Sequence, residues 1–342
     1  MKTLIFGGFE EFSMPKKSKL DNSYPPELSI TKELENKVDE MLKSTMRKTP
    51  NFWEDDISEC IYVTVDDGEI RVLHIKPKNP ISKRPVVFVA GWGGIVEAYT
   101  DLYEVIHDLV EFYYVETREK KSSKLNRKKA KMNMTQKAKD VGDAIKHLGI
   151  KNDDFVLFGT CWGGAVVLQG LLDKSIDAPT IVTHDPMHTL WFPKWFLRYI
   201  APLLPLFVAE MIKPILRRVQ LRGMKEKVQR QRAEAFIDNA EGWKWKKAAQ
   251  AVKDFELIGN LSPIEHEVFV INGTQDEVHD QISYPAMAKE MPNGRFVFMK
   301  TDESLRERLM GVTIREFSKV KCEDGLPSSL SDFEKELKRE VS

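Results

Sequence analysis

Apolar residues occur along the chain in two patterns, short continuous runs and wider helical repeats. Short runs rich in β-branched and aromatic residues predict strands, whereas apolar residues at helical spacing predict helices. The predicted strands are 60–65, 69–76, 86–94, 111–116, 155–160, 178–185, 266–273 and 295–299. The predicted helices between and after them are 134–149, 163–173, 284–291 and 305–320. Strand and helix patterns therefore alternate through most of the chain.

This alternation predicts an α/β architecture, with a largely parallel sheet covered by helices on both faces. The first two strands are separated by Asp66, Asp67 and Gly68, a strong hairpin signal, so we expect antiparallel pairing at one edge. In the helix 134–149, Thr135 is the expected N-cap and Gly149 lies just past the expected end.

The alternation is interrupted at residues 188–255, where an aromatic and proline-rich piece precedes basic helical sequence. An insertion of that length between two strands predicts a helical cap over one end of the sheet. The expected organisation is a partly helical N-terminal extension, a core in two parts separated by the cap, and a C-terminal tail, with bounds 1–56, 57–187, 188–255, 256–320 and 321–342.

The amino-acid composition limits the possible domain organisation, partners and cellular compartment. The chain has 342 residues, 42% of them hydrophobic, which suits one large α/β domain with an insertion. Basic and acidic residues balance at 52 each, so no global charge favours nucleic acid. Cys60, Cys161 and Cys322 are too far apart in sequence for a disulfide framework or metal-ligand spacing, so we expect a reducing cytoplasm, no metal and no cofactor. The start of the chain does not have the pattern of a signal peptide, and the apolar stretch 199–209 is too short to span a bilayer.

The candidate chemistry centres on Cys161, in the sequence Gly-Thr-Cys-Trp-Gly between a predicted strand and a predicted helix. Small residues at Gly159 and Gly163 permit a sharp turn that lifts the thiol clear of the backbone. The following helix N-terminus favours the thiolate form of a cysteine. Two backbone N–H groups, of Trp162 and of Trp92, would then form an oxyanion hole. The alternative is a tight turn in which Cys161 only fills buried space.

These residues resemble the α/β-hydrolase superfamily over roughly residues 57–320. The most specific element is the elbow Gly-x-Cys-x-Gly, with Gly91–Gly94 and the loop 272–280 following two other predicted strands. A cysteine in place of the commoner serine is similar to dienelactone hydrolases and polyhydroxyalkanoate synthases. The resemblance implies an acid after the strand 266–273, where Asp276 lies, or after the strand 178–185, where Asp185 lies.

The catalytic histidine is where this sequence departs from the family pattern. The resemblance implies a histidine after the strand 295–299, but no histidine follows position 279. His279 is the first candidate for the base, because it lies three residues after Asp276 and follows a strand end. His188, at the start of the cap, is the second candidate. The alternative is that the fold has no base at this site.

The aromatic and basic residues of the cap and of the stretch 118–131 indicate which partners the protein binds. Aromatic residues crowd its first half, and together they predict an apolar pocket for an acyl chain, namely Trp191, Phe192, Trp195, Phe196, Tyr199 and Phe207. Two basic stretches, 118–131 and 213–227, are either solvated faces or attractors of an anionic substrate, a coenzyme A phosphate or a membrane surface. The expected partner is a small hydrophobic acyl compound, with peripheral membrane contact through the cap and no nucleic acid.

These observations predict a hydrolase or acyltransferase that acts on an ester or thioester through Cys161, with Asp276 and His279 handling the proton. The competing prediction is a non-catalytic binding protein that keeps the elbow only as architecture.

Overall fold

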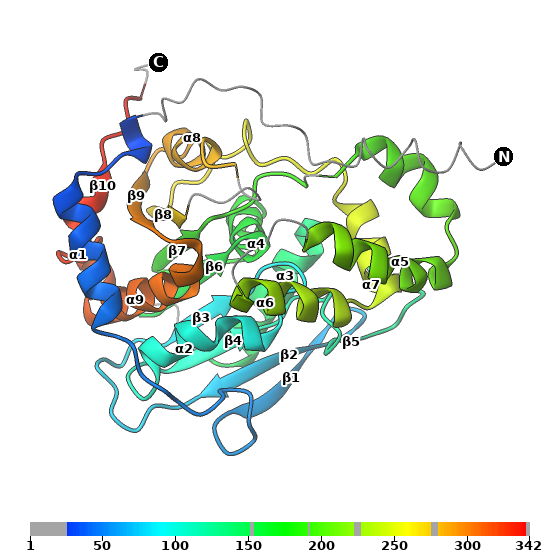
Figure 1. Ribbon diagram of the computed structural model, residues 1–342, viewed down its shortest axis with the longest axis horizontal. Coiled ribbons are helices and arrows are strands. Elements are labelled where there is room, and N and C mark those ends of the chain that lie inside the picture. Colours follow the sequence, from blue (N-terminus) through cyan, green and yellow to red (C-terminus); the bar gives the residue numbers. More distant parts are fainter. Residues whose placement is uncertain (1–25, 151–153, 191, 222–226, 275–279, 340–342) are drawn as a thin grey trace.

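A mixed sheet forms the centre of the protein in the computed structural model, which describes residues 26–150, 154–190, 192–221, 227–274 and 280–339 (Figure 1). In these residues the strand order is β1-β2-β4-β3-β6-β7-β8-β9-β10, with β5 beside β2. The strands are β1 (Glu59–Val65), β2 (Gly68–Ile75), β3 (Val86–Val89), β4 (Phe112–Val115), β5 (Lys124–Leu125), β6 (Val156–Thr160), β7 (Thr180–His184), β8 (Val268–Thr274), β9 (Gly294–Thr301) and β10 (Glu334–Lys335).

Strand direction follows the sequence pattern. The strands β4, β3, β6, β7, β8 and β9 are parallel to one another, and β3, β6 and β7 are buried along their whole length. This burial explains their continuous apolar runs, because both faces of these strands are covered by helices. The β1–β2 hairpin is antiparallel, and β2 is antiparallel to β4, so the predicted antiparallel edge is confirmed.

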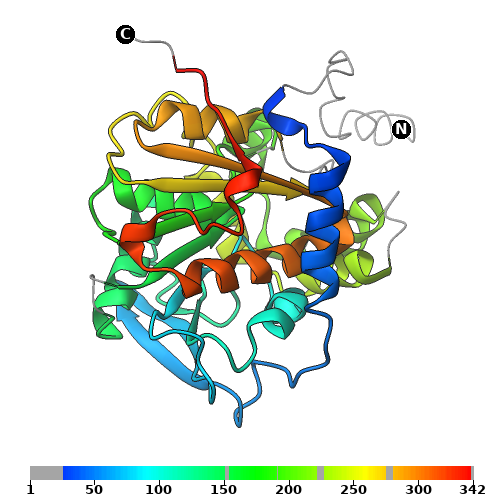
Figure 2. The ribbon, with the colours of Figure 1, turned by 90° about the vertical axis from the view of Figure 1, so that its left-hand side faces the viewer.

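Helices cover both faces of the sheet. One apolar layer includes α3 (Met134–His147), α4 (Trp162–Leu172) and α8 (Ser283–Glu290). The opposite layer includes α1 (Lys32–Lys43), α2 (Thr100–Ile106) and α9 (Arg306–Lys319), and Figure 2 shows α1 lying beside α9. Single-turn 3-10 helices occur at Pro26–Leu28 (η2), Val96–Tyr99 (η3), Glu303–Leu305 (η6), Cys322–Asp324 (η7) and Ser331–Phe333 (η8).

The N-cap of α3 differs from the prediction. Asn133, not Thr135, is the cap, and its side-chain oxygen accepts a hydrogen bond from the Gln136 N–H at 2.9 Å. Asparagine caps helices at least as well as threonine, so the helix begins at Met134, two residues earlier than a cap at Thr135 would allow. Gly149 lies beyond the end of α3 in the left-handed region, with φ 66°, as the prediction required.

The segments expected outside the core contribute to it where the structure describes them. Val38 and Leu42 of α1 are buried in the same apolar layer as α9. At the other end of the chain, Leu330 and Phe333 are buried in that layer too. The adjoining β10 extends the sheet by antiparallel pairing with β9. The described parts of the N-terminal and C-terminal segments therefore both pack in this apolar layer, and the C-terminal segment also extends the sheet edge.

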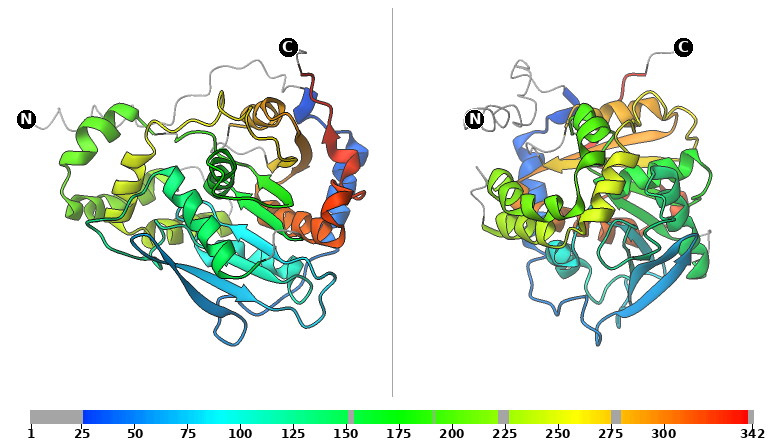
Figure 3. Two further views of the ribbon diagram at one scale, coloured as in Figure 1. Left: turned by 180° about the vertical axis from the view of Figure 1, so that it is seen from behind. Right: turned by 90° about the vertical axis from the view of Figure 1, so that its right-hand side faces the viewer.

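The segment between β7 and β8 is helical, as expected for a cap, and Figure 3 shows it at one end of the sheet. It contains the π-helical turn η4 (Phe196–Ile200), η5 (Ala201–Leu203), α5 (Leu206–Gln220), α6 (Lys227–Asp238) and α7 (Gly242–Ala251). No helix in the described part of the chain has the length and apolar composition needed to cross a membrane.

Candidate active site

The strand–turn–helix context expected for Cys161 is present. Cys161 joins β6 to α4 with φ 51° and ψ −120°, a backbone conformation that L-residues rarely adopt. Its N–H donates to the His184 carbonyl at 3.0 Å, and its carbonyl accepts from the N–H groups of Ala165 and Met187 at 3.2 and 3.1 Å. These three hydrogen bonds hold the strained turn in place. Cys161 itself is partly exposed.

The two glycines of the motif are required by close backbone approach. A Cβ at Gly163 would lie 2.0 Å from the Val89 carbonyl oxygen, and one at Gly159 would lie 2.8 Å from the Gly163 oxygen. Side chains at either position would therefore push α4 away from β3 and β6. The Gly-x-Cys-x-Gly pattern is a packing requirement of the turn, whatever the role of its cysteine.

The end of β3 lies beside the thiol. A Cβ built on Gly91 would lie 3.1 Å from the Cys161 Cβ and 3.6 Å from its Sγ, so the loop Gly91–Gly94 adjoins the elbow. Among the described residues, no acceptor is bonded to the backbone N–H of Trp92 or of Trp162. Both N–H groups are therefore available to a ligand beside Cys161.

Lys120, which was not singled out from the sequence, is hydrogen-bonded to the loop Gly91–Gly94. Its buried ammonium group donates to the Gly91 carbonyl and, at 2.7 Å, to the Gly94 carbonyl. The Gly91 N–H donates to the Tyr99 hydroxyl at 3.2 Å. Burial lowers the pKa of Lys120 to about 8 and raises the pKa of Tyr99. The sequence signal for Lys120 was hidden because it lies in a basic run that resembles a solvated surface.

An aromatic cluster lies beside the loop Gly91–Gly94, where the core meets the cap. The Trp92 ring contacts the rings of Trp162 and Trp245, with centroids 5.6 and 6.3 Å apart, and the Lys137 ammonium lies 4.3 Å from its centroid. Trp162 also contacts Phe255 at 5.8 Å. The candidate site is therefore bounded by aromatic side chains from the loop after β3, from α4, from the cap helix α7 and from the segment after α7.

Asp185, the alternative acid, is fully buried after β7 and has φ 47°. The Asn272 amide donates to its Oδ1 at 2.6 Å, and the Arg306 Nε donates to its Oδ2 at 2.8 Å. Arg306 begins α9, which follows β9 and the short η6, in the region where the resemblance implied a histidine. A guanidinium therefore donates to Asp185 in the described structure, and the expectation that Asp185 orients an imidazole stays a prediction. The signal that was missed is the basic residue at the start of the last predicted helix.

Two described histidines, His184 and His188, lie at or just after the end of β7, the strand whose last residue is bonded to the elbow. His184 ends β7 and is fully buried, and its Nδ1 is 3.2 Å from Asp185 Oδ2 without the alignment of a hydrogen bond. His188 pairs through Nδ1 with Glu256 at 2.6 Å, and its Nε2 lies 3.9 Å from Asp280. The first-choice pair, Asp276 and His279, lies outside the described residues.

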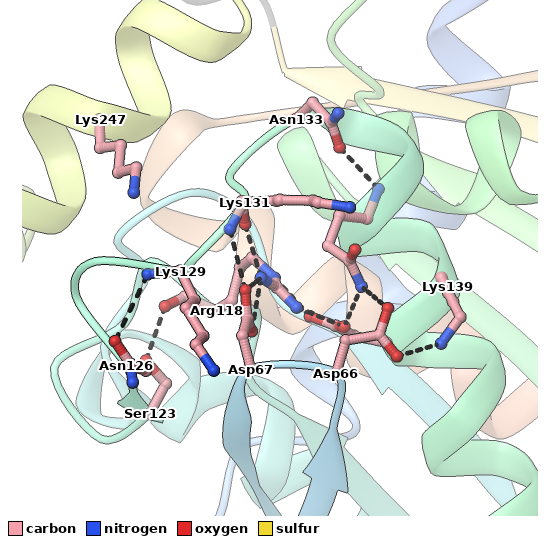
Figure 4. A network of polar contacts seen from close by, with 12 residues as sticks. Asp66, Asp67, Arg118, Ser123, Asn126, Lys129, Lys131, Asn133, Lys139 and Lys247 are labelled. Carbon is pink, nitrogen blue, oxygen red and sulfur yellow. Dashed lines mark hydrogen bonds and ion pairs between the residues drawn. The ribbon is translucent and has the colours of Figure 1, made fainter.

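The basic stretch after β4 starts inside the protein, whereas its later basic residues are exposed, namely Lys121, Lys124, Arg127, Lys128, Lys129 and Lys131. Arg118 is fully buried between Asp140 and Asp67, to which its guanidinium donates at 2.6 and 3.0 Å, and Figure 4 shows it beside Asp67. The buried Lys137 pairs with Glu119 at 2.9 Å. Burial alone would raise the pKa of Glu119, but the ammonium groups of Lys137 and Lys120 hold it at about 2. The charges at 118–120 therefore build the fold, and neither proposed surface role applies to them.

The cap is anchored to this same stretch. The ammonium of Lys244, buried on α7, donates to the carbonyls of Lys120 and Ser123 at 2.9 and 2.7 Å. Between the cap and the loop lies a polar cleft of about 110 Å³, whose lining includes Gly93, Gly94, Lys120, Glu116 and Trp245. The cleft opens beside the loop that adjoins Cys161.

The cap aromatic residues expected to line an apolar pocket have a different environment. Phe192, Trp195, Tyr199 and Phe207 are exposed to solvent, and Phe196 is partly buried, while Trp191 lies outside the described residues. Exposure of this extent does not fit the wall of a closed pocket. The reason is that η4, η5 and α5 turn other residues, such as Leu197 and Ala201, toward the rest of the cap.

Comparison with known proteins supports the fold assignment. No protein-family model matches the sequence, and no curated protein matches it. A thermophilic esterase from Thermogutta terrifontis superposes with a TM-score of 0.57, 20% identity, and coverage of 76% of this chain and 97% of that one. An esterase from Exiguobacterium antarcticum gives 0.61, 15%, 77% and 100%, and an α/β fold family hydrolase from Bacillus anthracis gives 0.51, 14%, 77% and 99%. At these identities the likeness is one of fold, and the chain has the α/β-hydrolase fold.

Proposed function

We propose that the protein hydrolyses or transfers the acyl group of an ester or thioester, with Cys161 as nucleophile. The observation that carries the proposal is the strained turn at Cys161, which places its side chain against Gly91 at the end of β3. Strained backbone of this kind is retained where the surrounding structure and the chemistry require it. The likeness of fold to esterases is consistent with this reaction class but does not by itself assign it.

In the proposed reaction the Cys161 thiolate attacks the acyl carbonyl carbon. The carbonyl oxygen becomes an oxyanion, which accepts hydrogen bonds from the N–H groups of Trp92 and Trp162. Collapse of this intermediate breaks the bond to the alcohol or thiol, which leaves with a proton, and a thioester remains on Cys161. Water or another acceptor then attacks the thioester and releases the acid or the transferred acyl product.

The base in this proposal is His279, oriented by Asp276, and His188 is the alternative. The assignment of His279 rests on its sequence position after β8. His188 has support from geometry, since the neighbouring Met187 N–H is bonded to the Cys161 carbonyl. Cysteine depends less on a base than serine does, because a fraction of the thiol is ionised at neutral pH.

The substrate class proposed is a hydrophobic acyl compound. The aromatic cluster of Trp92, Trp162, Trp245 and Phe255 beside the oxyanion loop supports an apolar acyl chain. The polar cleft beside Gly93 and Gly94 supports a polar leaving group or acceptor at the other side of the same loop. Three free cysteines support a reducing, cytoplasmic setting.

One observation favours a second candidate, a binding protein without acyl-transfer activity. Arg306 is the first residue of α9, in the region after β9 where the resemblance implies a histidine, and it donates to Asp185. A guanidinium remains protonated at neutral pH and cannot accept a proton from a thiol. In this candidate the elbow binds a carbonyl or carboxylate without forming a covalent bond.

The test is hydrolysis of short-chain nitrophenyl esters and acyl-coenzyme A thioesters by the wild-type chain and by Cys161→Ala, with Cys60→Ala as the control for an exposed cysteine. We expect Cys161→Ala to lose turnover and iodoacetamide labelling at this position, while Cys60→Ala keeps its activity. His279→Ala and His188→Ala, compared in the same assay, identify the base. Turnover retained by Cys161→Ala refutes the proposal, and an unreactive wild-type Cys161 supports the binding protein.

A further inference from the structure

An apolar residue recurs at every fourth position across the outer part of the cap. The series starts in the turn before η4, continues through η5 and ends in α5, and its members are Trp195, Tyr199, Leu203, Phe207, Met211 and Ile215. Each of them is between 49% and 80% exposed. Residues four apart lie on one side of a helix, so Trp195, Tyr199 and Leu203 form one exposed apolar face and Phe207, Met211 and Ile215 of α5 form a second. The two faces are separated by extended backbone at Leu204 and are together called the apolar stripe here.

The same segment buries its other side. Leu197 and Ala201 are 5% and 7% exposed, and both lie between members of the exposed series. The segment thus has two apolar sides, of which one packs on the cap and the other is left uncovered by the described chain. Phe192 and Ile200 add further exposed apolar surface next to the series. Soluble proteins rarely expose contiguous apolar surface of this extent unless it meets a partner.

The charges of this segment indicate the kind of partner. Residues 192–218 contain five basic residues and one acidic residue. Arg198 and Arg217 are bonded to Asp254 and Asp238. Lys194 and Arg218 are exposed and have no carboxylate partner among the described residues. The apolar stripe therefore has positively charged side chains near both of its ends.

We propose that the outer cap face, defined by these six exposed residues with Lys194 and Arg218, docks on the surface of an anionic lipid bilayer. Apolar side chains at the centre would enter the boundary between headgroups and acyl chains, and the cationic groups would meet lipid phosphates and carboxylates. Trp195 and Tyr199 suit this boundary, because each has a large apolar ring with one polar atom.

Two other occupants of the outer cap face agree less well with its exposure and charge. A second copy of the chain would bring the same cationic ends together at a two-fold interface, where like charges oppose each other. Docking on an acidic protein would satisfy the charges, but side chains that are 49% to 80% exposed project into solvent and do not line a shaped pocket for a partner's anchoring side chains. A lipid surface needs no such shape, which is why it is the occupant proposed.

The experiment is flotation of the full chain with vesicles of phosphatidylcholine alone and of phosphatidylcholine mixed with phosphatidylserine, at low and high salt. The test variant is Leu203→Glu with Met211→Glu. Its matched control is Met46→Glu with Ile81→Glu, which makes the same charge change at two exposed apolar residues outside the cap. Thermal melting of each variant establishes that it is folded.

We expect the wild type and the control to bind the mixed vesicles and to be released by salt, which screens charge attraction. The cap variant should bind at least about tenfold more weakly, because a carboxylate at either position resists transfer to the acyl boundary. Equal binding to both vesicle types, no binding, or equal loss in the control refutes the proposal. A wild-type dimer in sedimentation that the cap variant loses refutes it in favour of a second copy.

This inference does not depend on the proposed reaction. Leu203 and Met211 belong to neither the elbow nor the oxyanion loop, so hydrolysis of a soluble short-chain ester should be the same in the cap variant and the wild type. Loss of vesicle binding with activity unchanged, and loss of activity with binding unchanged, are separate outcomes that test the two proposals individually.

Discussion

The guanidinium Nε of Arg306 lies 2.8 Å from Oδ2 of Asp185, and it joins the start of α9 to the end of β7 beneath the elbow. Asp185 is fully buried, and the amide of Asn272 on β8 donates to its other oxygen. Three elements that are distant in sequence therefore meet at one carboxylate. In this protein the position implied for a catalytic histidine is used to neutralise a buried acid.

Removing Arg306 should leave the Asp185 charge poorly compensated. We expect Arg306→Leu to lower the free energy of unfolding by about 3 kcal/mol, as for other buried ion pairs that lose one partner. In the double variant Asp185→Asn with Arg306→Leu the loss should be smaller than the sum of the two single losses. Urea unfolding of the four chains measures this coupling. Additive losses would show that the pair is not energetically linked.

A side chain at Gly163 should prevent the elbow from closing on β3. The Cβ of Gly163→Ala would lie 2.0 Å from the Val89 oxygen, a backbone atom that cannot move away cheaply. We expect a loss of more than about 4 kcal/mol, or failure to fold. Gly149→Ala is the control, because its Cβ meets nothing within 4 Å and only its positive φ is costly. That variant should lose about 1–2 kcal/mol in the same thermal and urea unfolding measurements.

Lys244 should decide whether α7 stays attached to the core. In Lys244→Met the carbonyls of Lys120 and Ser123 lose a buried charged donor, so we expect a loss of about 2 kcal/mol. The loss should be local, with faster amide hydrogen exchange in α7 and unchanged exchange in β3 and β6. The control is Lys247→Met on the same helix, whose bond to the Arg127 carbonyl is exposed. Equal exchange in the two variants would contradict the role of Lys244 as an anchor.

Lys120 should give the stability of the protein a pH dependence in the alkaline range. Burial lowers its pKa to about 8 from the ordinary lysine value of 10.5, so the folded chain binds fewer protons than the unfolded chain between these values. The contribution of Lys120 to the free energy of unfolding therefore rises as the pH increases from 8 to 10.5, by at most about 1.4 kcal/mol per pH unit. Below pH 8 the burial of the charged ammonium is a constant cost.

The comparison that isolates this effect is wild type against Lys120→Met. The difference between their unfolding free energies should shift in favour of the wild type across that pH window and be flat below it. The change in activity is a separate readout, because Lys120 bonds to the carbonyls of Gly91 and Gly94, in the loop proposed to supply an oxyanion donor. A pH-independent difference in unfolding free energy would mean that Lys120 does not titrate in this range.

Much of the fold followed from the local pattern of apolar residues. The buried strands β3, β6 and β7 are continuous apolar runs because helices cover both faces of the sheet, and the Asp66–Gly68 turn predicted the hairpin. The Gly-Thr-Cys-Trp-Gly sequence predicted the turn at Cys161, since only glycines allow the close approach seen at Gly159 and Gly163. The strands, the hairpin and the turn at Cys161 are each determined by residues close together in sequence or by the strand or helix period of apolar residues.

The surroundings of the site were harder to predict for a physical reason. Arg118 and Lys120 lie in a run of basic residues that is typical of a solvated face, and their burial depends on acidic partners and carbonyls from distant segments. In the same way, the aromatic residues of the cap predicted a pocket lining, yet the packing of η4 and α5 on the rest of the cap left four of them exposed. Burial of a charge or exposure of a ring is decided by the partner, which a local pattern does not contain.

By itself, then, the sequence determined the α/β architecture, the elbow and the helical cap, because these are set by apolar periodicity and by glycine at fixed spacing. Tertiary structure alone decided that Arg306 pairs with Asp185, that Lys120 bonds to the Gly91 and Gly94 carbonyls and that the outer cap face is open to solvent. Each of these results from groups that are far apart along the chain and meet only when the sheet and the cap assemble.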